Sequence, residues 1–167
     1  PANDNEWSVP EGYTDIVEYL NDNSVNTNLN IYMSASESDD AEIILGSEEN
    51  REEAVDVIIE ELTVDYNQLG YNPYDGVTID FENLRGNMRD TEFLRKLNQE
   101  LDLIGKNLYV TVQPNMKNST YFDGYDFKAI GEIADKVILM AYDYNAKSIP
   151  QDVMDSGFTT TPVTPFD

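Results

Sequence analysis

The sequence predicts an α/β fold in which parallel strands alternate with helices along one chain. Four short segments carry apolar residues either at a period of two or as a continuous run, as strands do. The segments between them repeat their apolar residues at helical spacing, and Gly, Pro and Asn separate the elements. Strict alternation of strands and helices favours parallel strands joined by right-handed crossovers.

The elements in the first half of the chain follow from these patterns. We expect a loop over 1–12, a helix over 13–20 capped by Thr14, a strand over 29–35, an acidic connection over 37–46 and a helix over 48–69 ended by Gly70. Ser47 suits the start of the last helix, because its hydroxyl can accept a hydrogen bond from the first turn. Glu48 and Glu49 then lie at the positive end of the helix dipole.

The second half of the chain repeats the alternation. We expect a strand over 75–82, a helix from Asp90 or Thr91 to Gly105, a strand over 108–112, a helix from Asp126 through Ile133, a strand over 137–142 and an irregular segment over 151–167. Several strands end in polar or aromatic residues. The carboxyl ends of parallel strands meet at one edge, so these side chains are expected to converge there.

The strand over 75–82 has the strongest chemical signal. Its polar positions include Asp80 and Glu82, which are two residues apart and therefore point to the same face, about 6–7 Å apart. Two neighbouring carboxylates repel each other, so one of them is expected to hold a proton near neutral pH, as a general acid must. The alternatives are a solvated edge strand, or a cation site that also uses Asp75.

Composition limits the chemistry and the partners of the chain. Its 167 residues carry a net charge of −23, and no Lys or Arg occurs before Arg51, so binding to nucleic acid or anionic membranes is not expected. With no Cys and no His, nucleophiles of either type, zinc sites built on His and zinc fingers are excluded. No apolar run reaches the roughly 18 residues of a membrane span, and the first residues show no signal-peptide pattern. The acids Asp39, Asp40 and Glu42 fit no calcium-loop spacing, and we expect no metal or cofactor.

Two motifs resemble glycoside hydrolase family 18. Residues 75–82 (Asp-Gly-Val-Thr-Ile-Asp-Phe-Glu) look like its signature, in which Asp-Gly opens a strand and Asp-x-Glu closes it. Thr78 replaces a third acid that is often absent from the branch acting on spore and cell-wall peptidoglycan. Residues 137–143 (Val-Ile-Leu-Met-Ala-Tyr-Asp) resemble the sixth strand of the family, and 131–135 resemble the same branch. Ser34 is placed like a Ser of its third strand.

The resemblance implies a portion of a (β/α)₈ TIM barrel, with about four parallel strands equivalent to strands three to six. Residues 1–167 would be one partial catalytic domain, with the N- and C-terminal parts of the barrel missing, because such barrels usually need about 250 residues. Residues 162–165 would lead into the sixth helix. Four strands taken from a barrel would leave two open edges and expose apolar inner layers, so this chain is expected to pair with a second copy, or to have its edges covered by neighbours or termini. Little or no hydrolase activity is expected of it alone.

The resemblance also implies roles for individual residues. Glu82 would be the general acid, Asp80 would orient the substrate's acetamido group, Tyr142 would donate a hydrogen bond to that group, and Asp143, Met140, Gln113 and Ser34 would contact the sugar. Structural alternatives remain: core packing for Met140 and Tyr142, a strand end for Gln113 and a structural hydroxyl for Ser34.

The implied reaction is retaining, substrate-assisted cleavage of β-1,4 bonds next to N-acetylglucosamine in peptidoglycan. The partner would be a polysaccharide containing N-acetylglucosamine, and the place of action would be extracellular, at the cell wall or spore envelope. The alternatives are a chitinase, an endo-β-N-acetylglucosaminidase, or a relative that binds sugar without catalysis.

Overall fold

The computed structural model describes residues 12–35, 40–66, 69–85, 90–114 and 124–142, together with Gln151 and Asp155. Its centre is a parallel sheet with the strand order β1-β2-β3-β4. The strands are β1 (Asn28–Ser34), β2 (Gly76–Glu82), β3 (Asn107–Val112) and β4 (Lys136–Leu139). The prediction of an α/β fold with about four parallel strands is confirmed.

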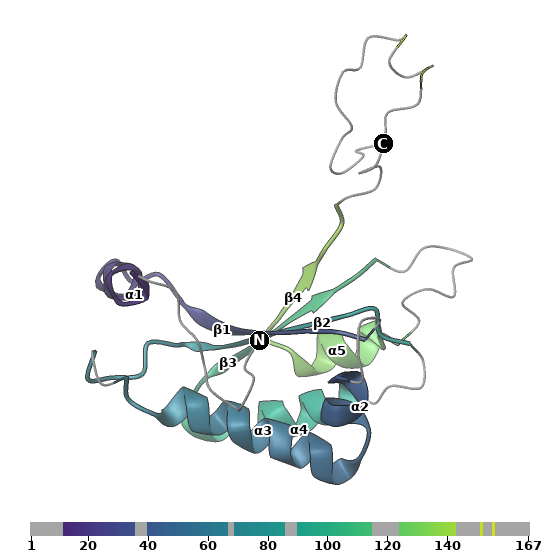
Figure 1. Ribbon diagram of the computed structural model, residues 1–167, viewed down its shortest axis with the longest axis horizontal. Coiled ribbons are helices and arrows are strands. Elements are labelled where there is room, and N and C mark those ends of the chain that lie inside the picture. The colour runs from purple at the N-terminus through teal and green to yellow at the C-terminus, as the bar shows by residue number, and fades with distance from the viewer. Residues whose placement is uncertain are drawn as a thin grey trace.

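Five helices are described around this sheet. They are α1 (Tyr13–Asp22), α2 (Asp40–Leu45), α3 (Glu48–Thr63), α4 (Asp90–Ile104) and α5 (Phe127–Ile133). Figure 1 shows α3 and α4 side by side below the sheet, with α2 and α5 near their right-hand end and α1 beyond the start of β1. None of the described helices lies over the opposite face, which we call the open face. No described helix has the length and apolar composition needed to cross a membrane.

The core lies between the sheet and α3 and α4. Its buried side chains come from alternate strand positions and from one side of each helix, and they include Leu29, Met33, Val77, Ile79, Phe81, Leu108, Val110, Val55, Leu62, Phe93, Leu97 and Leu101. The rings of Phe81 and Phe93 stack with their centroids 5.5 Å apart, which places the apolar side of β2 against α4. Burial of one such side chain contributes about 1.5–3 kcal/mol. The polar positions of the strands therefore face the open side.

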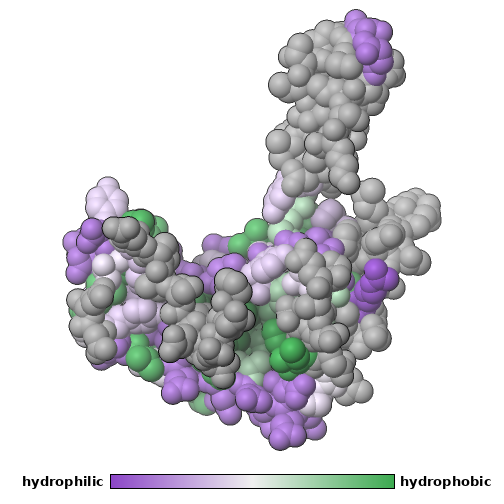
Figure 2. Space-filling view, in the orientation of Figure 1, coloured by the Kyte–Doolittle hydropathy of each residue, from purple (hydrophilic) through white to green (hydrophobic). Residues whose placement is uncertain are grey.

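The open face is largely polar. Asn30, Thr78, Tyr109 and Lys136 form one row across the four strands. The Lys136 ammonium lies 4.5 Å from the centre of the Tyr109 ring. The expectation that apolar side chains would be exposed holds at β4, where Val137, Ile138 and Leu139 are exposed. In β1, β2 and β3 the alternation sends most apolar residues to the helix side instead. Figure 2 shows that hydrophilic side chains also border the lower edge, where α3 and α4 lie in Figure 1.

Several helix ends agree with their sequence signals. The Ser47 hydroxyl accepts a hydrogen bond from the Asn50 N–H at 3.0 Å, so it caps α3 as predicted. Asp126 caps α5 through the Ala129 N–H, also at 3.0 Å. Gly105 follows α4 with φ at 66°, a left-handed conformation that glycine adopts without strain.

Other boundaries differ from the prediction. Thr14 does not cap α1, because Gly12 holds that position without a side-chain hydrogen bond. The acidic connection contains α2, and α3 ends at Thr63 rather than near Leu69. The chain then forms an isolated bridge between Tyr66 and Tyr71. Strand β4 ends at Leu139, before the predicted residue 142.

The segment predicted as irregular over 151–167 is described at two positions only. Gln151 and Asp155 have helical backbone there, and their side chains form a hydrogen bond of 2.9 Å. The prediction is therefore wrong at these two residues. Residues 162–165 lie outside the described part of the chain.

Candidate active site

The two predicted acids lie on the open face of β2, which has a neighbouring strand on each side, as β3 does. Asp80 and Glu82 are half-buried. The alternate residues of the same strand, Val77, Ile79 and Phe81, are buried on the helix side. The alternative of an edge strand is thus wrong. Glu82 is the last residue of β2 and pairs in register with Ser34 at the end of β1.

The Asp80 carboxylate is held from the neighbouring strand. The hydroxyl of Thr111 on β3 donates a short hydrogen bond to Asp80 Oδ1. Thr111 is buried, and on the other side Tyr32 of β1 pairs in register with Asp80. Asp80 therefore has a defined direction on the open face, set by residues that sequence analysis did not single out.

Ser34 and Gln113 lie beside Glu82, as predicted, but both contact protein groups. Ser34 is 4% exposed, and its hydroxyl accepts a hydrogen bond of 2.9 Å from the Asn83 side-chain amide. Gln113 Oε1 accepts from the Asn83 backbone N–H at 2.8 Å. These bonds give both residues a structural role, and contact of either side chain with a sugar stays a prediction.

The remaining predicted residues follow β4. The Met140 N–H donates to the Val112 carbonyl at 2.9 Å, which keeps Met140 beside the end of β3, where it is half-buried. Tyr142 is 50% exposed and is the last described residue of its segment. Asp143 lies outside the described residues.

Tyr125 is a residue at this edge that sequence analysis missed. It is 6% exposed, and its hydroxyl donates to the Phe81 carbonyl at 2.6 Å and lies 3.2 Å from Gln113 Oε1. Burial raises the pKa of Tyr125, and the negative charges of Glu82, Asp90 and Asp80 raise it further. The hydroxyl therefore stays protonated at neutral pH. One signal was present, because Tyr125 directly precedes the Asp126 cap of α5, at the edge where strands end.

Asp90, on the helix side of the sheet, is another residue with a raised pKa. It opens α4 and is 4% exposed. Burial raises its pKa from 3.8 to about 6, and the charge of Asp126 adds to this, although hydrogen bonds from Thr91 oppose the rise. The Thr91 N–H donates to Asp90 Oδ1 at 2.7 Å.

The alternative of a cation site at Asp75, Asp80 and Glu82 is wrong. Asp75 precedes β2, and its carboxylate accepts from the Thr27 N–H at 2.8 Å. Five residues of strand separate Asp75 from Asp80 by about 16 Å. Within the described residues no group of three or more acids could hold a metal ion. The side chains of Asp39, Asp40 and Glu42 are outside the described part of the chain.

The Asp-Gly pair that opens the motif has a structural reason. A Cβ on Gly76 would lie 2.1 Å from the carbonyl oxygen of Asn107 in β3, so a larger residue would push the strands apart. The N–H of Asn107 also donates to the Asp75 carbonyl at 3.0 Å. This end of the motif therefore fixes the register of β2 against β3.

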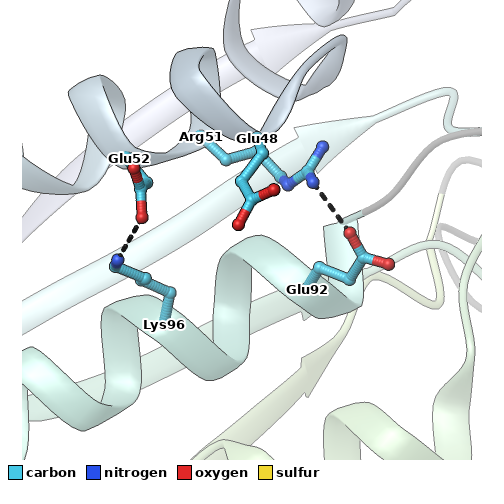
Figure 3. A pocket seen from close by; sticks show the side chains of 5 residues that line it. All are labelled: Glu48, Arg51, Glu52, Glu92 and Lys96. Atoms are coloured by element: carbon cyan, nitrogen blue, oxygen red, sulfur yellow. Dashed lines mark hydrogen bonds and ion pairs between the residues drawn. The ribbon is translucent and has the colours of Figure 1, made fainter.

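A groove of about 360 Å³ lies between α3 and α4, on the helix side rather than at the acidic pair. Figure 3 shows two ion pairs across it, from Arg51 to Glu92 at 2.8 Å and from Lys96 to Glu52 at 2.6 Å. All five lining residues are charged, and these pairs join the two helices. The groove is therefore helix packing, and the open face remains the candidate site.

Comparison with known proteins supports the motifs. The family model described as "Glycosyl hydrolases family 18" matches residues 3–166. The provisionally named sporulation-specific glycosylase YdhD of Bacillus subtilis (strain 168) is 36% identical over 83 residues, which are 48% of this chain and 20% of that protein. A crystal structure of ydhD from B. subtilis matches with a TM-score of 0.72 and 27% identity, over 95% of this chain and 49% of that chain.

More distant structures have the same fold. The spore cortex-lytic enzyme SleL of Bacillus megaterium QM B1551 matches with a TM-score of 0.62 and 22% identity, over 84% of this chain and 33% of that chain. The present chain thus spans less than half the length of these relatives. The prediction of a portion of a (β/α)₈ barrel is confirmed.

Proposed function

Because the chain belongs to glycoside hydrolase family 18, we propose that the protein cleaves β-1,4 bonds next to N-acetylglucosamine in peptidoglycan. The observation that carries this proposal is the placement of Asp80 and Glu82 on the open face, at the carboxyl end of the inner strand β2. Active sites of (β/α)₈ enzymes lie at that end of the barrel. Residues 1–167 would form part of the catalytic domain.

Glu82 is the proposed general acid. Its carboxyl gives a proton to the glycosidic oxygen while the bond from that oxygen to the sugar C1 breaks. The acetamido oxygen of the same sugar forms a new bond to C1, so no carboxylate of the protein attacks the sugar, unlike the usual two-carboxylate scheme. Water then attacks C1 and gives a proton to Glu82 while the bond from C1 to the acetamido oxygen breaks, so the acetamido group is restored and the configuration at C1 is retained.

Asp80 and Tyr142 are proposed to serve the acetamido group. Positive charge develops on this group as its oxygen bonds to C1, and the Asp80 carboxylate would stabilise that charge. The bond from Thr111 holds Asp80 in one direction, which supports such a role. The exposed Tyr142 would donate a hydrogen bond to the acetamido group. Met140 and Asp143 would contact the sugar beside it.

Peptidoglycan is the proposed substrate, at the cell wall or spore envelope. The support is the relative named as a sporulation-specific glycosylase, which is 36% identical over 83 residues. Chitin shares the required acetamido group, so chitooligosaccharides belong in the same assay. A non-catalytic sugar-binding protein is the other outcome that the assay must separate, since Thr78 replaces an acid of the family motif.

The test is Glu82→Gln in the full natural chain. The amide keeps the shape of the side chain but has no acidic proton, so cleavage of acetylated glycan should fall by about 10²–10⁴ while sugar binding persists. Glu60→Gln, an exposed position on α3, is the matched control and should cleave normally. Normal turnover by Glu82→Gln would contradict the assignment, and binding without any cleavage by the unsubstituted protein would indicate a non-catalytic relative.

A further inference from the structure

We propose that Gln113 and Tyr125, together with Asn83, are positioning residues that fix the backbone on both sides of Glu82. Their role would be to keep the Glu82 carboxyl aimed at the glycosidic oxygen. This inference rests on the proposed function of Glu82 as the general acid.

Three consecutive residues, with Glu82 in the middle, each have a backbone group that is bound by a different segment. The Phe81 carbonyl accepts from the Tyr125 hydroxyl at 2.6 Å. The Glu82 carbonyl accepts from the N–H of Ala35, just after β1, at 2.9 Å. The Asn83 N–H donates to Gln113 Oε1 at 2.8 Å. The general acid is therefore the middle residue of a backbone segment that is held from both sides.

Near Glu82, side chains replace the backbone hydrogen bonds that join β2 to β3 earlier in the strand. The backbone register between β2 and β3 ends at Ile79 and Val110. In a parallel sheet, alternate residues direct their backbone groups to opposite neighbours, so Phe81 and Asn83 face the β3 side while Glu82 faces β1. Past the end of the register, Tyr125 and Gln113 supply the partners that strand β3 no longer gives.

Asn83 turns the chain immediately after Glu82. Its φ of 60° lies in the left-handed region, which Asn tolerates better than most residues other than Gly. The Asn83 side-chain amide donates to Ser34 Oγ at 2.9 Å, which ties the turn to the end of β1. An unusual conformation next to an acidic residue persists only when the surroundings hold it, and these bonds do so.

A close backbone approach places Tyr125. A Cβ on Gly124 would lie 2.5 Å from the Arg85 nitrogen and from the Leu84 carbonyl carbon, so only glycine fits there. The Gly124 N–H also donates to the Leu84 carbonyl at 3.2 Å. The segment before α5 is thereby fastened to the segment after β2, and Tyr125 reaches the Phe81 carbonyl from it.

The orientation of the Gln113 amide follows from its partner. A backbone N–H can only donate, so the Gln113 atom that faces Asn83 is the oxygen. That oxygen binds the protein backbone, which supports the positioning role, and the sugar contact predicted from the sequence stays a prediction. A reacting group displaced by about 1 Å can lose about 10²-fold in rate, so loss of this support should appear in kcat.

The experiment compares Tyr125→Phe and Gln113→Leu with Tyr74→Phe in the full natural chain. Tyr74 is a matched control, because it is a buried tyrosine whose hydroxyl accepts a hydrogen bond from Tyr13 at 2.5 Å. It lies just before the start of β2, at the end of the strand opposite to Glu82. We expect kcat on an acetylated oligosaccharide to fall about 10–100-fold in the first two variants, with KM within about threefold. Tyr74→Phe should keep the kcat of the unsubstituted protein. Gln113→Glu keeps an acceptor oxygen and should recover at least about tenfold over Gln113→Leu.

Asn83 gives an independent pair of variants. Glycine adopts the left-handed φ freely, whereas a β-branched residue does not, so Asn83→Gly should have a higher kcat than Asn83→Val. Equal kcat in this pair, or Tyr125→Phe and Gln113→Leu within about threefold of Tyr74→Phe, would overturn the positioning role. A failure of Gln113→Glu to recover activity would also overturn it. Full activity in Glu82→Gln would instead overturn the proposed function itself.

Discussion

Asp90 shows how one buried residue can make stability depend on pH. Its folded-state pKa of about 6 lies above the ordinary 3.8, so between these values the folded state holds more protons than the unfolded state. The contribution of Asp90 to folding is therefore most favourable at low pH and is lost as pH rises through about 6. A change of this size corresponds to about 3 kcal/mol at most.

We predict that Asp90→Asn removes this loss. The amide oxygen can still accept from Thr91 but never ionises, so the variant should be more stable than the unsubstituted protein by about 1–3 kcal/mol at pH 7.5. At pH 4 the difference should shrink. Urea unfolding at both pH values measures it, with Asp102→Asn, an exposed acid of the same helix, as control. A difference between Asp90→Asn and the unsubstituted protein that does not change with pH would contradict the prediction.

A second prediction at the residue scale concerns Asp80. A thiazoline analogue of N-acetylglucosamine mimics the cyclised acetamido group, so it should inhibit the full natural chain. Asp80→Asn should bind the analogue more weakly, by about tenfold or more, because a carboxylate that stabilises positive charge is lost. Inhibition constants for the two proteins provide the measurement. Equal constants would mean that Asp80 does not face the acetamido group.

The acidic pair could be predicted at this scale because its geometry is local. Residues i and i+2 of a strand share a face, so Asp80 and Glu82 follow from β2 alone. Thr111 and Tyr125 could not be predicted in the same way. They reach β2 from 31 and 44 residues away in sequence, through a register and a loop path that no local pattern specifies.

At the scale of elements, Arg51 joins three helices. Its guanidinium donates to the Leu45 carbonyl at the end of α2 at 2.9 Å and pairs with Glu92 of α4 at 2.8 Å. Arg51 is 7% exposed, whereas the side chains of Lys96 and Glu52 in the neighbouring ion pair are 41% and 50% exposed. Most of the stabilisation at this groove should therefore come from Arg51.

We predict that Arg51→Met lowers the free energy of unfolding by about 1–3 kcal/mol, because the Leu45 carbonyl loses its buried donor. Lys96→Met, in the same groove, should change it by less than about 1 kcal/mol, since exposed ion pairs contribute little. Urea unfolding of the two variants checks this. Equal destabilisation by Arg51→Met and Lys96→Met would show that the contact of Arg51 with the Leu45 carbonyl contributes no additional stability.

The helices were predictable where a capping residue stood at the end of a segment whose apolar residues repeat at helical spacing. Ser47 with its following acids marks the start of α3, and Gly105 marks the end of α4. Helix α2 was missed because six residues span less than two turns and give no clear period. The end of α3 was predicted too late. Val64 has an extended backbone and ends the helix, although neither Gly nor Pro stands there to mark the end.

At the scale of the whole molecule, the described helices cover one face of the sheet, and no described strand pairs with its outer edges. Strands β1 and β4 have one described neighbour each, and Val137, Ile138 and Leu139 of β4 are exposed. The net charge of −23 opposes contact between copies. Association would therefore depend on salt, which screens such repulsion.

We predict that the isolated 167-residue chain forms dimers or larger species at about 0.5 M salt, where screening acts within a few Å. Its hydrolase activity should be small, since the described strands supply one side of a sugar site. Light scattering and a chitooligosaccharide assay measure both properties. A monomer at high salt with activity equal to that of the full natural chain would contradict this prediction.

The most direct test of the central claim compares acetylated and de-acetylated oligosaccharides of equal length as substrates of the full natural chain. If Asp80 and Glu82 act through the acetamido group of the sugar, only the acetylated chains should be cleaved, and the first product should keep the configuration at C1. Equal cleavage of both substrates, or inversion at C1, would contradict the account.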